Sequence, residues 1–490
     1  MTRLAVAAPS RAAADAAGDV ARAGGSAVDA AIAAALVAMV NEVGLVSLSS
    51  GGFVAVQPAS GPAYTVDGWM DRPGRGRDEG APPARTWDVT TEYGGGVTIT
   101  IGPGSVATHG SLAAFGEAHA RDGRLPWREL LAPAVDVARG GFALGSASRF
   151  YLRYVHETVF GWDDVSRAAL HDAEGRLTED RVVVPDLAAT LEHIAAEGPR
   201  ALHRGDLAEL VVGDLQARGG LLSAADLAAY EPVVRAPLTT RVGPWSLATT
   251  PPPSVGGVVV ASMLRLLDDH PRARWDADDV AHLVRVQRAV LGHRREELEV
   301  AGDLDEASRA WLDRVDADHR AVLESGSTAQ VSVTDADGAA CSITVSSGYG
   351  AGMVAAGTGI WLNNCLGEQE LNPPGRPSAP GSRLLSNMAP TVGRHADGAT
   401  LAIGSPGADR ITTAVVSALA GFVSGGLDLA SAVAHRRVHV HRAGLPDEDV
   451  RVEDEPSMYF GGVGAALTGA DGHLEAVADP RRAGVAEVVS

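Results

Sequence analysis

Residues 324–338 read ESGSTAQVSVTDADG, and we expect this stretch to decide the fold. Small residues lead to Thr328, after which polar and apolar residues alternate as they do in a β-strand. The segment DADG at 335–338 is typical of a tight turn, and a second β-type run, AACSITVSS, fills 339–347. The stretch therefore predicts a β-hairpin with Thr328 at its entrance.

Thr328 is a candidate nucleophile because a cut before it would give the residue its own base. A hydroxyl nucleophile usually relies on a histidine held by a carboxylate, but the sequence lacks the G-x-S-x-G motif of α/β-hydrolases. The other available base is the nucleophile's own α-amino group, whose pKa of about 8 suits neutral pH. Gly326 and Ser327 allow the turn needed for attack on the preceding carbonyl. The plain alternative is a threonine that opens a strand after a Gly/Ser turn.

Composition limits the classes of partner and cofactor. The 490 residues suffice for a large core, and we favour one continuous core over separate domains. With 61 acidic and 41 basic residues, the net charge of −20 argues against nucleic acid as a partner. Every basic residue is an arginine, so the chain has neither a phosphate-binding GK[ST] loop nor a lysine for a Schiff base. We expect no cofactor.

Cysteine content and hydropathy indicate the compartment. Cys341 and Cys365 are too few for a disulfide framework or a four-thiolate metal site, so we expect free thiols. The N-terminus lacks the pattern of a signal peptide. The longest apolar run, 30–40, is about half as long as a membrane helix. These features predict a cytoplasmic protein with no membrane partner.

Local patterns predict a layered α+β domain. Residues 26–40 begin with a serine suited to cap a helix and continue as an Ala-rich apolar run, which predicts a buried helix. Residues 48–68 favour a hairpin, and the Pro/Gly-rich residues 70–98 favour a long surface loop. Helical patterns dominate the middle third, and β-type runs return after 328.

Motifs along the whole chain resemble those of the γ-glutamyltransferase family of N-terminal-nucleophile hydrolases, and they occur in that family's order. The matching segments are AGGSAVDAAIAAAL (23–36), PPPSVGG (251–257), TAQVSVTDADG (328–338), GIWLNN (359–364), LLSNMAPT (384–391) and GSPGADRI (404–411). Gln330 stands where a histidine is usual in the family. The chain is identified as a divergent member.

The resemblance implies a fold and a mechanism. The fold would be an αββα four-layer sandwich with a helical middle region, cut by the protein itself into residues 1–327 and 328–490. The two fragments would stay together as a heterodimer in one globular unit. Thr328 would be the nucleophile and Ser346 would match a second hydroxyl residue that bonds it. The amides of Gly407 and Ala408 would face a developing oxyanion.

The substrate pocket that the resemblance implies departs from the family pattern. Trp69 stands where family members that take γ-glutamyl groups carry an arginine for the α-carboxylate, a task suited to a guanidinium. Arg72 and Arg75 are alternatives at the wrong spacing. Trp69 predicts either an apolar pocket wall or a core aromatic residue.

Four further residues match binding positions of the family. Ser386 and Asn387 replace a Ser-Ser pair, and Asn387 still offers hydrogen-bond donors. Cys365 and Glu368 replace Gln and Asp at the site for the α-amino group, where Glu368 can bind an ammonium. Substitutions at the buried residues that bind the α-carboxylate and the α-amino group alter which acyl group is accepted.

The predicted function is therefore cleavage of an amide, γ-glutamyl or related, in a small molecule through an acyl-enzyme. One alternative is a member with changed specificity, such as an acylase, an oxamate-type amidohydrolase or a carbon–carbon bond hydrolase. A second is an uncleaved, inert homologue, which Gln330 makes conceivable. A metal site at His439 and His441 is a weaker interpretation, since alternation along a strand explains this pair, and His109 is expected to be structural. We expect no metal.

Overall fold

Two β-sheets lie face to face in the computed structural model, which describes residues 1–78, 80–93, 96–267, 276–317, 329–372, 378–407, 410–443 and 445–490. Within these ranges one sheet has the order β19 (Val485–Val489), β1 (Leu4–Ala8), β9 (Ala329–Asp335), β10 (Ala340–Ser346), β2 (Gly51–Gln57), β3 (Tyr64–Gly68), β6 (Val233–Arg235). The other has the order β18 (Leu474–Ala478), β17 (Gly464–Thr468), β14 (Thr400–Gly404), β13 (Thr391–His395), β8 (Trp245–Thr249), β7 (Leu238–Val242). All neighbouring strands are antiparallel.

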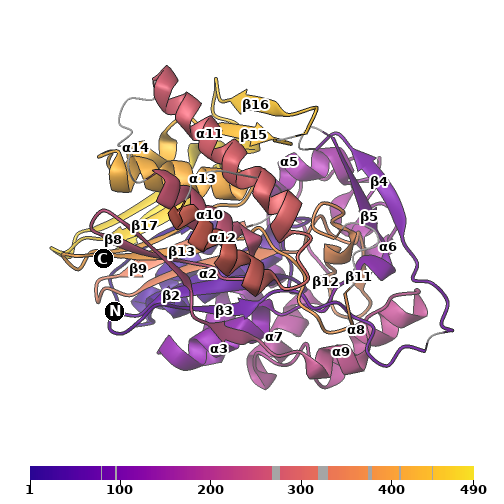
Figure 1. Cartoon of the computed structure of the whole chain (residues 1–490). Coiled ribbons are helices and arrows are strands. Elements are labelled where there is room, and N and C mark those ends of the chain that lie inside the picture. Colours follow the sequence, from indigo (N-terminus) through magenta and orange to yellow (C-terminus); the bar gives the residue numbers. More distant parts are fainter. Residues whose placement is uncertain are drawn as a thin grey trace.

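Helices cover the outer faces of both sheets (Figure 1). The first sheet is covered by α1 (Arg11–Arg22), α2 (Ala27–Asn41) and α3 (Ser111–Asp122), with α4 (Trp127–Gly140) packed against α2. The second sheet is covered by α10 (Val255–Leu267), α13 (Arg410–Leu419) and α14 (Leu429–Ala434), with α11 (Ala277–His293) and α12 (Leu304–Ala317) outside α10. The predicted α+β class and αββα sandwich are confirmed.

The middle of the chain is helical, as predicted. It contains α5 (Ser146–Val155), α6 (Asp164–Leu170), α7 (Leu187–Glu197), α8 (Asp206–Ala217) and α9 (Ala224–Ala229). The prediction of a surface loop over 70–98 is wrong in part, because β4 (Trp87–Thr91) pairs with β5 (Val97–Ile101). Its strand signal, short runs rich in Thr and Val, is masked by the neighbouring Pro and Gly residues. Two further short pairs join β11 (Val354–Ala355) to β12 (Ile360–Trp361) and β15 (Val438–His441) to β16 (Asp449–Val452).

The predicted buried helix is confirmed as α2. Asp29 N donates to Ser26 Oγ at 3.1 Å and Ser26 N donates to Asp29 Oδ2 at 2.9 Å, which forms a capping box. Every residue of α2 is buried, because the helix lies between the first sheet and helices α1 and α4. An apolar sequence on all sides suits this place.

The predicted hairpin is also confirmed, as β9 and β10. Asp335 Oδ1 accepts hydrogen bonds from Asp337 N at 3.1 Å and from Ala339 N at 3.0 Å, which fixes the turn. This turn sets the register, and at the far end of the hairpin Val345 pairs with Ala329.

A polar layer lies between the two sheets. Ser332 Oγ on β9 donates to Gly464 O at 2.9 Å, and Ser342 Oγ on β10 donates to Ile403 O at 3.0 Å. The buried apolar residues form two large clusters, one around α2 and the other around α10 and α13, and small clusters, one of which joins the two sheets. The expectation of one continuous core in place of separate domains stays a prediction.

Strands from the two parts of the chain alternate within the first sheet. Strand β1 lies between β19 and β9, although the latter two come from the sequence after residue 328. In the second sheet, β7 and β8 come from the first part of the chain, and β8 pairs with β13 from the second part. Each sheet is therefore built from both parts.

Buried ion pairs hold the start of β17. Arg437 Nη2 donates to Asp479 Oδ2 at 2.5 Å, and Arg481 Nη1 donates to Asp479 Oδ1 at 3.1 Å. Asp479 Oδ2 also accepts from Val463 N at 2.8 Å, directly before β17. Because all three side chains are buried, each charge needs its partner to offset the cost of removing it from water.

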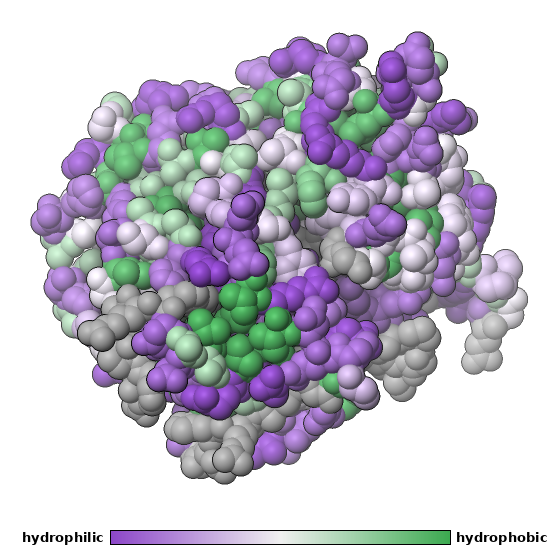
Figure 2. Space-filling view, turned by 90° about the horizontal axis from the view of Figure 1, so that it is seen from above, coloured by the Kyte–Doolittle hydropathy of each residue, from purple (hydrophilic) through white to green (hydrophobic). Residues whose placement is uncertain are grey.

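Hydrophilic residues cover much of the face of the molecule shown in Figure 2, and hydrophobic residues gather there in a central patch. Among the described residues, no helix has both the length and the apolar character needed to cross a membrane.

Candidate active site

Several strand ends meet at one end of the sandwich. In the first sheet these are the start of β9 at Ala329, the end of β10 at Ser346 and the start of β2 at Gly51, which pairs with Ser346. In the second sheet they are the end of β14 at Gly404 and the start of β17 at Gly464, which pair with each other. The antiparallel order thus assembles segments that are far apart in the sequence.

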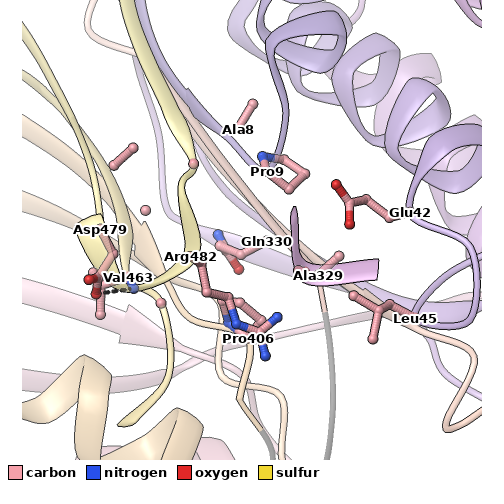
Figure 3. A pocket seen from close by; sticks show the side chains of 15 residues that line it. Ala8, Pro9, Glu42, Leu45, Ala329, Gln330, Pro406, Val463, Asp479 and Arg482 are labelled. Atoms are coloured by element: carbon pink, nitrogen blue, oxygen red, sulfur yellow. Dashed lines mark hydrogen bonds between the residues drawn. The ribbon is translucent and has the colours of Figure 1, made fainter. Parts of the chain in front are cut away.

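A cavity of about 40 Å³ lies at the start of β9 (Figure 3). Two of the predicted catalytic residues, Thr328 and Ala408, fall outside the described residues. Ala329, which follows Thr328 in the sequence, is buried and lines the cavity. Gln330 and Pro406 line it as well, so the cavity adjoins both the predicted nucleophile hairpin and the predicted oxyanion loop.

Gln330 is a fully engaged amide. Its two Nε2 hydrogens are shared among three acceptors, Val331 O at 2.8 Å and the hydroxyls of Ser332 and Ser342, both at 2.9 Å. Its Oε1 accepts from Thr344 Oγ1 at 2.5 Å. These bonds fix Gln330 in the polar layer between the sheets, and they are more than a neutral imidazole can make. The departure from the family's histidine is therefore built into the packing of this chain.

The structure brings Ser346, Glu368 and Cys365 together. Ser346 Oγ accepts from Gly348 N at 3.0 Å, and the Glu368 side chain packs against Gly348. Burial raises the pKa of Glu368 to about 8, the charge of Glu370 adds to the rise, and a hydrogen bond with Cys365 opposes it. Burial also raises the pKa of the Cys365 thiol, so Cys365 is no thiolate nucleophile at neutral pH.

Glu368 offers an acceptor without a donor. Its side chain is buried, and within the described part of the chain its Oε2 has no hydrogen-bond partner. Such an atom is stabilised by a ligand that donates a hydrogen bond, most strongly by an ammonium.

Trp69 is a core residue that also borders the site. Its side chain is 2% exposed, stacks on Phe53 and donates from Nε1 to Leu385 O at 2.8 Å. It lies against Gly51, the strand partner of Ser346. The indole therefore takes space beside the site without offering a positive charge. Of the two alternative arginines, Arg75 packs against Gly381, and Arg72 bonds through its backbone to Ser382.

Ser386 and Asn387 follow Leu385 and are both buried. Ser386 Oγ accepts from Met388 N at 3.2 Å, so this hydroxyl is engaged. Neither polar atom of the Asn387 amide has a hydrogen-bond partner among the described residues. A buried amide without partners is costly, which marks this position as one that a ligand or water completes.

The predicted oxyanion loop begins as expected. Strand β14 ends at Gly404 and α13 begins at Arg410. Gly407 has a φ of +129°, and a methyl group there would lie 2.6 Å from Gly461 Cα, so only glycine fits. Ser405 Oγ accepts from Gly462 N at 3.0 Å and ties the loop to the segment before β17.

Glu42 is a site residue that the sequence did not reveal. It follows α2, lines the cavity beside Ala329, and its side chain points toward Pro9 and Ala329 (Figure 3). Burial raises its pKa to about 7, while Ser148 and Arg482 oppose the rise. Its only sequence signal is an acidic residue directly after an apolar helix.

His439 and His109 are both buried and contact other protein groups. His439 is buried, and its Nδ1 lies 3.2 Å from Thr413 Oγ1. His109 Nε2 lies 3.3 Å from Leu202 O, and burial lowers the pKa of His109 to about 4. No cluster of three or more His, Cys, Asp or Glu residues suited to a metal ion occurs in the part of the chain that the structure describes.

Known proteins resemble the chain over most of its length. A family model described as gamma-glutamyltranspeptidase matches residues 13–489. The glutathione hydrolase proenzyme of Escherichia coli is 28% identical over 94% of this chain and 88% of its own. Acylase ACY 1 proenzyme of a Pseudomonas strain is 30% identical over 85% and 78%, respectively. The solved cephalosporin acylase from Bacillus halodurans is 20% identical and aligns with a TM-score of 0.78 over 99% of this chain and 96% of its own, which shows a shared fold.

Proposed function

This chain belongs to the gamma-glutamyltranspeptidase family and is a γ-glutamyltransferase-like hydrolase or acyltransferase, and we propose that it cuts itself before Thr328 and uses that residue as its nucleophile. The freed α-amino group serves as the base, and the acyl group passes through an ester on Thr328 Oγ. Small-molecule amides are the substrates of this family.

One observation carries the proposal: Ala329, the residue after Thr328 in the sequence, lines a cavity at the meeting point of the strand ends. The predicted partners of the reaction adjoin the same end. Ser346 follows Val345, the strand partner of Ala329, and Pro406 of the oxyanion loop lines the cavity. The amides of Gly407 and Ala408 are proposed as the oxyanion donors.

The test compares the purified protein with a Thr328→Ala variant by intact mass and N-terminal sequencing. We expect the wild type to give two fragments, 1–327 and 328–490, the second beginning Thr-Ala-Gln. The variant is expected to remain one chain of 50.3 kDa. A single uncut chain in both samples would remove the amine base from the mechanism and favour the inert homologue.

A changed acyl specificity is the second candidate, because Trp69 occupies the place expected for a carboxylate-binding arginine while Glu368 keeps an available acceptor. We propose a substrate whose acyl group carries an amine or another hydrogen-bond donor and lacks an α-carboxylate. The p-nitroanilides of γ-glutamyl, glutaryl and 4-aminobutyryl groups test this, since the last two each lack one of the two charged groups of the first. We expect the highest kcat/KM for the 4-aminobutyryl anilide.

Glu368→Gln is expected to remove that preference, because glutamine, unlike Glu368, cannot give up a proton to form the carboxylate that pairs with a bound ammonium. If the γ-glutamyl anilide reacts fastest with the wild type, the carboxylate is bound elsewhere and the second candidate fails. The nucleophile assignment is independent of that result.

A further inference from the structure

The described part of the proposed oxyanion loop, residues 404–407, lies against a second backbone segment. This segment, residues 459–463, leads from η6 (Met458–Phe460) to β17, and we call it the strap. A methyl group on Gly407 would lie 2.6 Å from Gly461 Cα, and one on Gly461 would lie 3.1 Å from Pro406 O. The loop and the strap therefore meet through their backbones.

Buried charged side chains hold the strap in place. Arg437 Nη1 donates to Phe460 O at 2.9 Å, and Asp479 Oδ2 accepts from Val463 N at 2.8 Å (Figure 3). Arg437 and Asp479 are the buried ion pair described above, so each is itself restrained. Hydrogen bonds to charged groups are the stronger kind. The strap is thus a firm support for the loop.

The Ser405 hydroxyl joins the loop to this support. Its Oγ accepts from Gly462 N at 3.0 Å and donates to Pro406 O at 2.6 Å. The Ser405 side chain is buried, which strengthens both hydrogen bonds because water is excluded. One hydroxyl therefore fixes the Pro406 carbonyl beside the strap by using its hydrogen and one of its acceptor sites.

The direction of the Pro406 carbonyl sets the direction of the Gly407 N–H. The two groups belong to one planar trans peptide unit, in which they point in opposite directions. Because Pro406 O is held toward Ser405 Oγ, the Gly407 N–H points away from it. Within the described part of the chain this N–H donates to no acceptor. It is an available donor next to Pro406, which lines the cavity at Ala329.

Gly407 does not hold this peptide by itself. Its φ of +129° lies in a region that glycine adopts as readily as negative values, so the residue permits the peptide before it to turn. A donor that stabilises an oxyanion is effective when it is oriented before the charge develops, since it then needs no reorganisation during the reaction. The restraint on the Gly407 N–H must therefore come from a neighbouring group.

Resting on the function proposed above, we propose that Ser405 is the positioning residue of the Gly407 oxyanion donor. Its hydroxyl keeps the Pro406–Gly407 peptide in the orientation that presents the Gly407 N–H to the negative oxygen of the tetrahedral intermediate. Without the hydroxyl the peptide turns among several orientations, and the donor is lost in part of the molecules. Substrate binding changes little, because the negative charge exists only after attack on the substrate.

The experiment measures kcat and KM of Ser405→Ala. The substrate is whichever of the three p-nitroanilides named above the wild type hydrolyses fastest, and rates are expressed per cut molecule, as counted by intact mass. We expect kcat to fall at least about tenfold, toward the roughly 100-fold or greater loss that removal of an oxyanion donor causes. KM is expected to stay within about twofold of the wild-type value, because the interaction is made only in the transition state.

Three further variants separate positioning from general packing. Ser405→Thr keeps the hydroxyl and is expected to return kcat to within about threefold of the wild type, whereas Ser405→Cys has a weak donor and is expected to be slower than the threonine variant. Ser262→Ala is the matched control. Ser262 is buried in α10, donates to Val258 O at 2.7 Å and accepts from Trp311 Nε1 at 2.9 Å. Its loss is expected to lower the melting temperature and to leave kcat unchanged.

The assignment of Ser405 is wrong if Ser405→Ala keeps kcat within about threefold of the wild type, or if its defect lies in KM alone. It is also wrong if Ser405→Thr is as slow as Ser405→Ala, or if Ser262→Ala loses kcat to the same degree. Should the alanine variant fail to fold or to be cut, the order of the threonine and cysteine variants decides.

The wild type separates this inference from the function on which it rests. A wild-type chain that stays uncut, or that is cut and hydrolyses none of the anilides, overturns the proposed function and the role of Ser405 with it. A cut and active wild type with an unchanged Ser405→Ala overturns only the role of Ser405.

Discussion

Glu368→Gln should change how the stability of the protein depends on pH. Burial raises the pKa of Glu368 from its ordinary value of 4.5 to about 8, with a smaller contribution from Glu370. The folded chain therefore holds this proton more tightly than the unfolded chain. The resulting stabilisation is complete below about pH 4.5 and is lost as the pH rises through 8. At about 1.36 kcal/mol for each pH unit between the two values, the loss approaches about 5 kcal/mol.

Glutamine stays neutral, so the variant lacks this dependence. We expect its free energy of unfolding, relative to the parent, to increase by about 4 kcal/mol between pH 5 and pH 9, because part of the full difference falls below pH 5. Urea unfolding followed by tryptophan fluorescence measures this difference in a Thr328→Ala background, which is expected to keep both proteins as one uncut chain. Glu179→Gln, whose side chain is 92% exposed, is the control and should change by less than about 0.5 kcal/mol.

The reasoning is refuted if the difference between Glu368→Gln and its parent stays within about 0.5 kcal/mol from pH 5 to pH 9. Such a result would mean that Glu368 is solvated or paired in solution, and it would also remove the basis for an ammonium site at this residue.

Four other substitutions, at three residues, test the packing around the site, with thermal unfolding as the measurement. Trp69→Phe should cost about 1–2 kcal/mol through loss of the hydrogen bond to Leu385 O, and Trp69→Ala about 3–5 kcal/mol, whereas an exposed wall residue would show neither cost. Gln330→His should cost about 2 kcal/mol, because imidazole cannot replace all four hydrogen bonds, and an unchanged melting temperature would contradict that network. Asp479→Ala should cost about 3–5 kcal/mol by leaving Arg437 buried and unpaired, and a loss below about 1 kcal/mol would show that the buried pair is not sustained in solution.

Local signals in the sequence were sufficient for the elements that carry the site. Ser26 marked the start of α2, where the structure adds Asp29 to the cap, and the Asp335 turn marked the hairpin. Both depend on contacts between residues close in sequence, which is why they are readable without a structure. Family motifs supplied the four-layer arrangement, which no local signal contains and which the solved relative shares. Family membership and a hydrolase or acyltransferase function are now shown.

Long-range contacts were not predictable from local signals. Glu42 precedes Ala329 by well over half the chain, and only the order of strands brings both to one cavity. The choice for Trp69 between pocket wall and core depended on Leu385, which is equally remote in sequence. The roles of Thr328 and Ala408, the two-fragment organisation and a cytoplasmic location stay predictions.

The alternation of strands from both parts of the chain has a consequence for handling the protein. If the chain is cut before Thr328, β1 of one fragment remains bonded on both edges to strands of the other. Dilution would then leave the activity per molecule unchanged, because the two fragments would be held together by strand pairing within a sheet. Separately produced fragments would each lack neighbours for their strands and expose long unpaired edges, which favours aggregation over reassembly. Production as a single precursor is therefore the route by which such a pair of fragments reaches its folded state.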